Sequence, residues 1–285
     1  MQVVVNGKAA AAPQRRCWVS QEQAAAIRLI DHFCHSEYAR LDLDAVVDEY
    51  MQNFVQPLIA LAGAPRSVAD IGAGYGWLAF AFALGTDAEV TMMEYDAKRS
   101  HAAQQIAAIL GIAHRIRWLV GSIADIPLQD RSIDAVYCIE VIEHTGVDRR
   151  YVAELCRISN DVLVITTPNK VFPIIRHDTV LPFCHWLPLG ARNVYAGWCG
   201  RRHLQQDNLF WSPMQLLRAV DGFERQSRFL QFATHAQYRL AQRATQGSGG
   251  WFDAVQEAYF AAVAMTGRLG IFLLPNLAST FRRKG

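Results

Sequence analysis

From about residue 67 onward, short apolar runs alternate with stretches whose apolar residues recur at helical spacing. A short apolar run bounded by turn residues is typical of a buried strand, and repeats of three and four residues are typical of a helix. Five strands are expected on this basis, at 68–71, 89–93, 116–120, 135–139 and 162–166. Helices are expected at 77–84, 97–110 and 147–157. Strands alternating with helices predict an α/β fold with a parallel sheet and helices on both faces.

The region before this alternation has a different pattern. Residues 1–17 resemble a loose tail, and Ser20 followed by Gln23 predicts a capping box at the start of a helix. Apolar residues at helical spacing predict a second helix over 43–61, which Pro57 is expected to bend. We therefore divide the chain into an N-terminal tail with helices (residues 1–62) and a main domain (residues 63–285).

Composition narrows the class of protein. Hydrophobic residues make up 52% of the chain and charged residues 19%, which provides ample material for a buried core. The net charge of +2 gives no general attraction to nucleic acid. Six cysteines without a C-x-x-C pair argue against a zinc site, so no metal is expected, and they favour a cytoplasmic setting. The N-terminus does not resemble a secretory signal, and the apolar stretch 269–281 is too short to span a membrane.

The sequence VADIGAGYG lies where the first predicted strand passes into a helix. Its glycines, Gly72, Gly74 and Gly76, allow a sharp turn and a close approach of the backbone to a ligand. The free N–H groups of the following helix suit a carboxylate or a phosphate. A tight turn without any ligand is the alternative interpretation.

The second chemical signal is Glu94, at the end of the second strand and 24 residues after Asp70. A carboxylate at this position can accept hydrogen bonds from both ribose hydroxyls of a nucleotide. A solvated glutamate is the alternative, but the glycine turn upstream favours ligand binding. Trp77 stands where a dinucleotide fingerprint requires glycine, which argues against NAD. The chain also lacks a P-loop sequence.

With these motifs in order, residues 67–169 resemble the class I S-adenosylmethionine-dependent methyltransferases. VADIGAGYGWLA resembles the glycine-rich first motif, VTMMEYD the acidic second motif, and GSIADIPLQDRSIDAVYCIEVIEH the loop and fourth strand of that family. The resemblance implies a Rossmann-like methyltransferase fold with a mostly parallel seven-stranded sheet. CIEVIEH and TPN are also similar to the ubiquinone-biosynthesis O-methyltransferases and their relatives.

The resemblance implies a role for each matching residue. Asp70 and the three glycines would hold the methionine part of S-adenosylmethionine, and Glu94 would hold its ribose. Ser122 and Ile123 would line the adenine, and Ile139 and Glu140 would lie near the sulfonium and the methionine tail. Many relatives have an acidic residue where Ser122 stands. Asp125 either takes over that contact or caps a turn.

The implied reaction is methyl transfer from S-adenosylmethionine to a small-molecule acceptor, expected at oxygen. Transfer to nitrogen or carbon is the next alternative, followed by an NAD(P)-dependent oxidoreductase and by a non-catalytic module that binds a partner protein. His144 follows the fourth strand and is the first candidate base, unless it only bonds a neighbouring loop. His177, Asp178 and His185 form a second candidate group, for each of which packing is the alternative.

Two later segments have their own interpretation. Residues 171–215 are rich in proline, histidine and aromatic residues and are predicted to cover the substrate, with a packed helical subdomain as the alternative. A flexible connection is expected at 246–250 and a helix at 251–265. The basic C-terminus after the apolar residues 271–274 predicts weak membrane-surface contact or a final pair of strands. No DNA- or RNA-methylation motif is present, so nucleic acid is not an expected partner, and the oligomeric state is left open.

Overall fold

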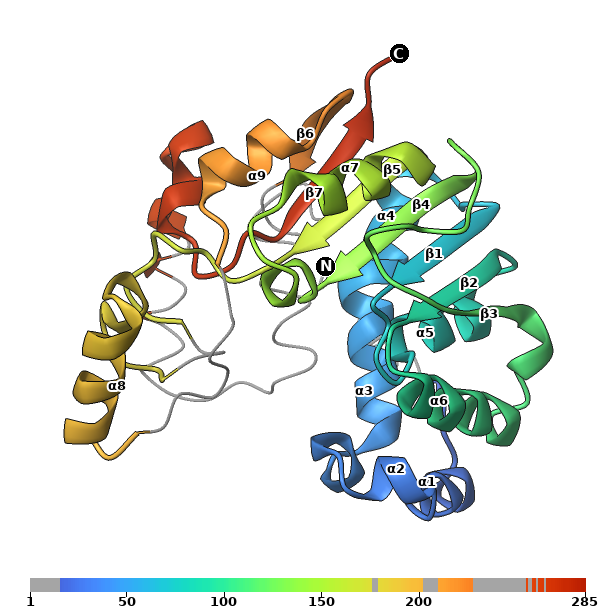
Figure 1. Cartoon of the computed structure of the whole chain (residues 1–285). Helices are drawn as coiled ribbons and strands as arrows, with labels where there is room; N and C mark the ends of the chain where they lie inside the picture. Colours follow the sequence, from blue (N-terminus) through green and yellow to red (C-terminus); the bar gives the residue numbers. More distant parts are fainter. Residues whose placement is uncertain are drawn as a thin grey trace, which may run out of the picture.

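The sheet at the centre of the molecule follows the predicted alternation (Figure 1). The computed structural model describes residues 16–175, 179–201, 210–227, 255, 258–259, 261–263 and 265–285. Within this part of the chain, seven strands form one sheet in the order β3-β2-β1-β4-β5-β7-β6. The strands are β1 (Ser67–Ile71), β2 (Glu89–Glu94), β3 (Ile116–Val120), β4 (Ile133–Ile139), β5 (Ser159–Thr166), β6 (Phe223–Ser227) and β7 (Ser279–Arg283).

The first five strands run parallel, and β7 lies antiparallel between β5 and β6. This arrangement confirms the predicted Rossmann-like methyltransferase fold with its mostly parallel seven-stranded sheet. Because β1, β2 and β4 are parallel neighbours, their carboxyl ends meet at one edge of the sheet, where α/β folds bind ligands. The glycine turn, Glu94 and Glu140 follow or end these strands and therefore lie at that edge.

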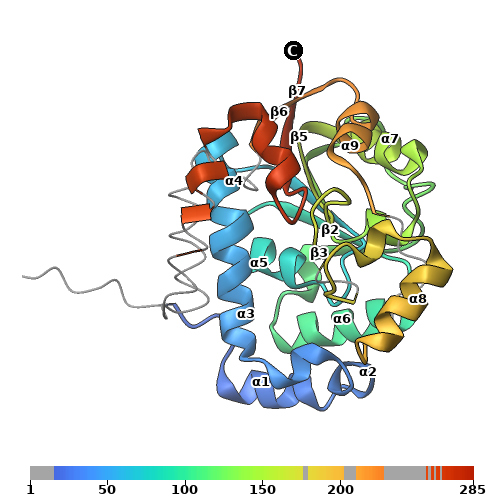
Figure 2. The same cartoon turned by 90° about the vertical axis from the view of Figure 1, so that its left-hand side faces the viewer.

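Helices cover both faces of the sheet (Figure 2). On one face, the helices before β1 join α5 (Trp77–Gly85) and α6 (Ala97–Ile109) in a hydrophobic cluster that includes Phe80 and Tyr137. On the other face, α7 (Arg149–Ile158) and α9 (Pro213–Ala219) pack in a second cluster, which contains the fully buried Trp211. Cys138 is buried in this second cluster, as its apolar surroundings in the sequence predicted. Apolar side chains therefore cover both faces of the sheet, and this packing holds the strand ends in place.

The N-terminal helices are part of this packing. They are α1 (Gln21–Arg28), α2 (Asp31–Cys34), α3 (Leu43–Tyr50) and α4 (Gln56–Ala62). The capping box at α1 is confirmed, because Ser20 Oγ accepts from the Gln23 amide while the Gln23 side chain accepts from the Ser20 amide. Phe33, Val47 and Leu58 are buried in the cluster that also holds α5, so residues 16–62 share a hydrophobic core with the sheet.

The predicted helix over 43–61 consists of three segments. A π-helical turn, η2 (Met51–Val55), joins α3 to α4, and Pro57 stands in the first turn of α4. Proline has no N–H to donate to the preceding turn, and a π-turn immediately before it accommodates that missing bond. The bend predicted from Pro57 thus takes the form of a local widening of the helix.

The C-terminal part differs more from the prediction. The alternative of a final strand pair is right for Arg282 and Arg283, which lie in β7, whereas residues 271–273 belong to the 3₁₀ helix η6 (Gly267–Leu273). The predicted connection at 246–250 and most of the predicted helix at 251–265 lie outside the described residues, as does nearly all of the predicted tail. None of the helices described is long and apolar enough to cross a membrane.

Candidate functional site

The glycine turn is tied to the neighbouring strand by its own backbone. The amides of Gly72 and Ala73 both donate to the Met93 carbonyl, at 2.8 and 3.1 Å. A Cβ at Gly72 would lie 2.5 Å from the Val141 side chain, so packing alone requires glycine there. Gly74 is different, because it adopts a φ of +60° and a Cβ would meet only Arg99, at 4.0 Å. Gly74 therefore combines a left-handed backbone with open space in front of it.

Glu94 closes the other side of the turn. One carboxylate oxygen accepts from the Gly74 amide at 2.7 Å, and the other accepts from the Asp96 amide at 3.1 Å. The Arg99 guanidinium lies 3.7 Å away, and Glu94 is only 6% exposed. The predicted alternative of a solvated glutamate is therefore wrong. Each carboxylate oxygen has a second lone pair, so both can still accept a hydroxyl from a ligand.

Asp70, at the centre of the same edge, is buried. Its Oδ2 atom has no hydrogen-bond partner among the described residues. Burial raises the pKa of Asp70 to about 7, a backbone amide at Ala79 acts in the opposite direction, and the Glu94 carboxylate raises it further. A buried carboxyl group with an unused oxygen fits a cationic group brought by a ligand, because a nearby positive charge would stabilise its ionised form.

Tyrosines from the N-terminal helices border this edge, although no sequence motif indicated a functional role for them. Tyr50, at the end of α3, hydrogen-bonds Tyr38, and burial raises the pKa of Tyr50 well above its ordinary value, with a further rise from Tyr38 and Asp70. Within the glycine turn, the Tyr75 hydroxyl lies 3.0 Å from His32 Nδ1 in α2. These contacts fasten the N-terminal helices to the turn.

The predicted adenine residues follow β3. Ser122 Oγ accepts from the Ala124 amide at 3.2 Å, and its carbonyl accepts from the Asp125 amide at 3.1 Å, which makes a tight turn. The Ile123 side chain is buried in the second hydrophobic cluster, which also contains Met93 of β2. Asp125 is exposed, and its amide closes the turn that Ser122 begins.

A pair of glutamates follows β4. Glu140 has a left-handed φ of +54°, and its amide donates to both the carbonyl and the hydroxyl of Thr166 at the end of β5. Glu143 is fully buried, accepts from the Thr167 hydroxyl at 2.9 Å and shares a hydrogen bond with Glu140. Burial raises the pKa of Glu143 to about 8, and the Glu140 carboxylate adds to that rise. The pair therefore retains a proton at neutral pH.

The candidate bases occupy different surroundings. His144 ends the 3₁₀ turn η4 (Ile142–His144) directly after β4 and is exposed at the carboxyl edge of the sheet. His177 and Asp178 lie outside the described residues. His185 is buried in the predicted cover segment, where its Nε2 lies 3.0 Å from the Lys170 carbonyl. The packing alternative therefore describes His185 well.

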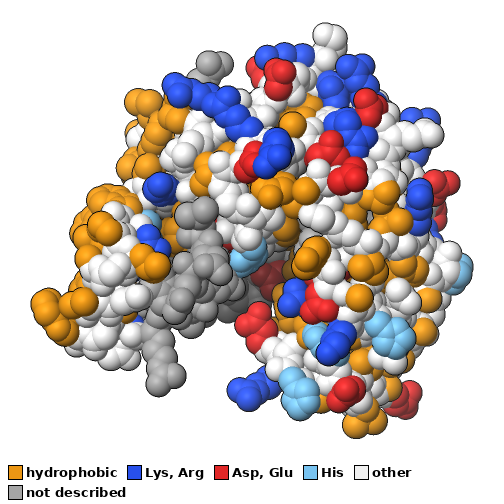
Figure 3. Space-filling view, in the orientation of Figure 1, with side chains coloured by type: hydrophobic (Ala, Val, Ile, Leu, Met, Phe, Trp, Pro, Cys, Tyr) orange, Lys and Arg blue, Asp and Glu red, His pale blue; other side chains and the backbone are white. Residues whose placement is uncertain are grey.

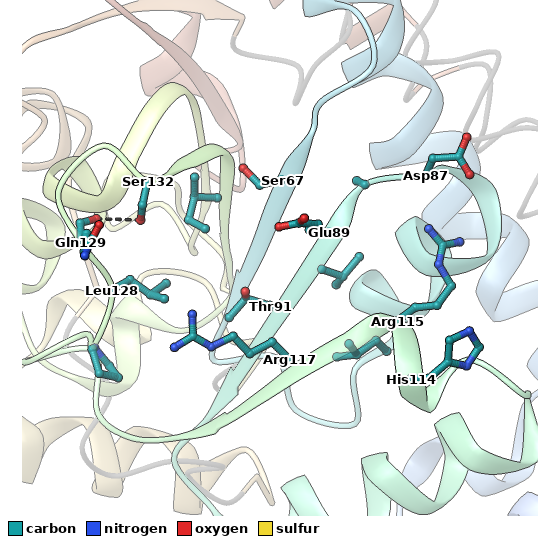
Figure 4. A pocket seen from close by; sticks show the side chains of 15 residues that line it. Ser67, Asp87, Glu89, Thr91, His114, Arg115, Arg117, Leu128, Gln129 and Ser132 are labelled. Carbon is teal, nitrogen blue, oxygen red and sulfur yellow. Dashed lines mark hydrogen bonds between the residues drawn. The ribbon is translucent and has the colours of Figure 1, made fainter.

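A polar groove of about 1000 Å³ lies at the other edge of the sheet (Figure 4). It is lined by the first residues of four strands, Ser67, Glu89, Ile116 and Ile133, and by Arg117. None of the predicted cofactor residues lines this groove. Because α/β folds bind ligands at the carboxyl ends of their strands, the groove is not the predicted site.

One group of potential metal ligands occurs among the described residues. Asp31, Cys34 and His35 are exposed on and just after α2, and their donor atoms lie within 4.8 Å of one another. The sequence predicted no metal site, and none of these three residues belongs to the set selected from the sequence motifs.

The strand order, the glycine turn and the acidic residue at the end of β2 are together typical of a Rossmann-like nucleotide-binding domain. Residues 68–161 match the model of a methyltransferase domain family. This match and the likeness to S-adenosylmethionine-dependent methyltransferases support S-adenosylmethionine as the cofactor.

The relatives found by sequence comparison are also methyltransferases. The chain is 29% identical over 128 residues to a probable S-adenosylmethionine-dependent methyltransferase of Mycobacterium tuberculosis, covering 44% of each chain. It is 30% identical over 197 residues to the glycine/sarcosine/dimethylglycine N-methyltransferase of Actinopolyspora halophila, covering 64% of this chain and 35% of that protein. The chain thus spans less than half the length of these curated relatives.

Among solved structures, the fold is similar to that of a candidate sarcosine dimethylglycine methyltransferase from Galdieria sulphuraria. The TM-score is 0.50 at 16% identity, over 84% of this chain and 86% of the other. At this identity the likeness concerns the fold alone.

Proposed function

We propose that this protein transfers a methyl group from S-adenosylmethionine to a small-molecule acceptor. The observation that carries the proposal is the junction of the glycine turn with Glu94, where an open, left-handed Gly74 faces a buried carboxylate. An NAD(P)-dependent oxidoreductase is not supported by the methyltransferase match over 68–161.

In this proposal, different residues at the carboxyl edge of the sheet bind different parts of the cofactor. Asp70 accepts the ammonium group of the methionine part through its unused oxygen, and Gly74 lets the backbone approach it. Glu94 accepts the ribose hydroxyls, and Gly72 and Gly76 fix the shape of the turn. Ser122 and Ile123 border the adenine, and Ile139 and Glu140 border the sulfonium end.

S-adenosylmethionine supplies an electrophilic methyl group on its sulfonium, so the protein mainly has to align an acceptor and handle a proton. His144 is exposed at the same edge and accepts the proton that a hydroxyl or amine acceptor loses. His177 and Asp178 remain the second candidates for this task. Residues 171–215 close over the acceptor and exclude water.

Oxygen is the proposed acceptor atom, on the likeness of CIEVIEH and TPN to the ubiquinone-biosynthesis O-methyltransferases. Nitrogen is the second candidate, because a relative of 30% identity is an N-methyltransferase. The proposed location is the cytoplasm.

The test is a screen of phenols, hydroxy acids and secondary amines, read out by release of S-adenosylhomocysteine and by mass spectrometry of the product. Turnover of hydroxyl compounds alone is expected, and turnover of amines alone would show that nitrogen, not oxygen, is the acceptor atom.

With the accepted compound, His144→Ala should lower kcat at least about tenfold and leave cofactor affinity nearly unchanged. The matched control is His114→Ala, an exposed histidine at the opposite edge of the sheet. Equal kcat values for the two variants would remove His144 as the base.

A further inference from the structure

An exposed apolar surface is carried by the segment around α8 (Leu189–Trp198), within the predicted cover. We call it the α8 surface. Its large hydrophobic side chains are each at least 36% exposed: Val180, Phe183, Trp186, Leu187, Leu189, Val194 and Trp198. Soluble monomers seldom leave so many large apolar side chains exposed in one place, and such patches usually mark an interaction site.

The helix α8 stands apart from the packed core. Figure 1 shows it at the far side of the molecule from β3, and Figure 3 shows hydrophobic side chains gathered over the same region. Of the described residues of α8, none belongs to either hydrophobic cluster of the sheet. Ala196 is its one buried residue. Within the described part of the chain, α8 therefore contributes little to the hydrophobic core.

The outward face of α8 is apolar because its apolar residues recur at helical spacing. Ala191, Val194 and Trp198 recur at intervals of three and four, which places them on one face of a helix, away from the buried Ala196. Trp198 is 85% exposed and Val194 is 52% exposed. An ordinary surface helix would place polar residues there.

The turn before α8 extends this face. The rings of Phe183 and Trp186 lie 4.9 Å apart, and both side chains are about half exposed. The Trp186 Nε1–H donates to the Lys170 carbonyl at 2.6 Å, so the polar atom of the indole is satisfied within the protein. What Trp186 shows to the outside is apolar ring surface.

The charge of this segment indicates what kind of partner binds to the α8 surface. Residues 179–201 contain no aspartate or glutamate, although the whole chain has 26 acidic residues among 285. The same segment carries Arg192 and Arg201. Aromatic and aliphatic side chains accompanied only by positive charge suit the interface of a bilayer that contains anionic lipids.

We propose that the α8 surface docks on an anionic lipid bilayer, with α8 lying in the plane of the interface. A helix of 10 residues is about 15 Å long, about half the hydrocarbon thickness, so it can lie in the interface but cannot span it. Tryptophan is favoured at this depth because its ring is amphipathic. The proposal concerns a surface separate from Glu94 and Gly74 and does not depend on methyl transfer.

The experiment is co-sedimentation of the full chain with vesicles of mixed phosphatidylglycerol and phosphatidylcholine, beside vesicles of phosphatidylcholine alone. Binding to the anionic vesicles is expected, with weaker binding as salt concentration rises.

A double variant, Val194→Asp with Trp198→Asp, should reduce the bound fraction at least about tenfold. Its melting temperature should match that of the wild type, because both side chains are exposed. Arg201→Gln, which removes only charge, should weaken binding to anionic vesicles and leave binding to the neutral phosphatidylcholine vesicles unchanged.

The matched control is Leu29→Asp, which changes a residue that is 84% exposed at the end of α1. It should bind vesicles like the wild type. Absence of vesicle binding by the wild type, or an equal loss in the control and the double variant, would overturn the proposal. Light scattering adds a further check. If the wild type forms a dimer that the double variant cannot form, and vesicles are not bound, the surface is an interface between two copies and the lipid proposal is wrong.

Discussion

The Glu94 carboxylate accepts a hydrogen bond from the Gly74 amide at 2.7 Å, which joins the end of β2 to the turn that follows β1. The same carboxylate accepts from Asp96, whose side chain caps the next helix, α6. A single buried side chain thus fixes the relative positions of two loops at the carboxyl edge of the sheet. Such a group is held in place before any ligand arrives, which lowers the entropic cost of binding.

The first prediction concerns this carboxylate. Glu94→Ala should weaken binding of S-adenosylhomocysteine more than about tenfold, because the variant loses both the proposed ribose contact and the link to Gly74. Isothermal titration calorimetry measures the affinity. The control is Glu89→Ala, at the exposed opposite end of the same strand, which should bind normally. Unchanged affinity in the Glu94 variant would remove that residue from the site.

The second prediction separates backbone strain from ligand contact. Gly74→Ala and Gly111→Ala both place an alanine at a left-handed φ, of +60° and +76°, and neither added Cβ meets an atom closer than 4.0 Å. Each variant should lose about 1–2 kcal/mol of unfolding free energy in a urea titration. Only Gly74→Ala should also lose at least about tenfold in affinity for S-adenosylhomocysteine, because its methyl group occupies the proposed cofactor space. Equal affinities would place the cofactor elsewhere.

The third prediction uses the pKa of Asp70, which burial raises to about 7. At pH 6 the carboxyl group is largely protonated, and an ammonium group bound beside it favours ionisation, so binding of S-adenosylhomocysteine should release a proton. Calorimetry in two buffers of different ionisation enthalpy measures that release. Asp70→Asn should abolish it, whereas Glu143→Gln should retain it. Proton release that survives in the Asp70 variant would contradict this assignment.

Much of the parallel half of the fold follows from local sequence pattern. The strand at 116–120 was predicted with its observed bounds, and β1 and β2 within one residue at either end, because short apolar runs between turn residues indicate strands. The glycine turn and Glu94 were predicted for the same reason, since their spacing around one strand is local. These features need no knowledge of distant contacts.

The other half depends on tertiary contacts that leave little local signal. A final pair of strands was predicted only as an alternative and β6 was not located, because FERQS and STFRR each contain a single apolar residue. Ser279 and Thr280 are nevertheless buried, since β7 lies between two other strands. Tyr50 is close to Asp70 because α3 packs against α5, a tertiary contact without a local signal. The burial of Glu143 was likewise not predicted, because a glutamate between apolar residues and a histidine normally indicates a surface turn.

The fourth prediction follows from that buried glutamate. In the unfolded chain Glu143 loses its proton near its ordinary pKa, whereas in the folded protein burial and the Glu140 carboxylate raise its pKa to about 8. Between these pH values the folded state binds more protons, so the free energy of unfolding should fall as pH rises from about 5 to about 8. Glu143→Gln cannot ionise and keeps an oxygen for Thr167, so it should show a smaller fall. Urea unfolding at several pH values measures both, and parallel curves would exclude Glu143 as the cause.

The fifth prediction tests how the C-terminal segment is held to the sheet. The Asn169 side chain, fully buried just after β5, donates to the carbonyls of Ile271 and Leu274 at 3.0 and 2.7 Å. Asn169→Ala leaves both carbonyls without this donor, so the free energy of unfolding should fall by about 2–4 kcal/mol. Asn160→Ala is the control, because that exposed side chain donates to Asp134, which is also paired with Arg66, and it should cost less than about 1 kcal/mol. Urea unfolding followed by circular dichroism measures both variants, and equal losses would show that Asn169 does not anchor residues 271–274.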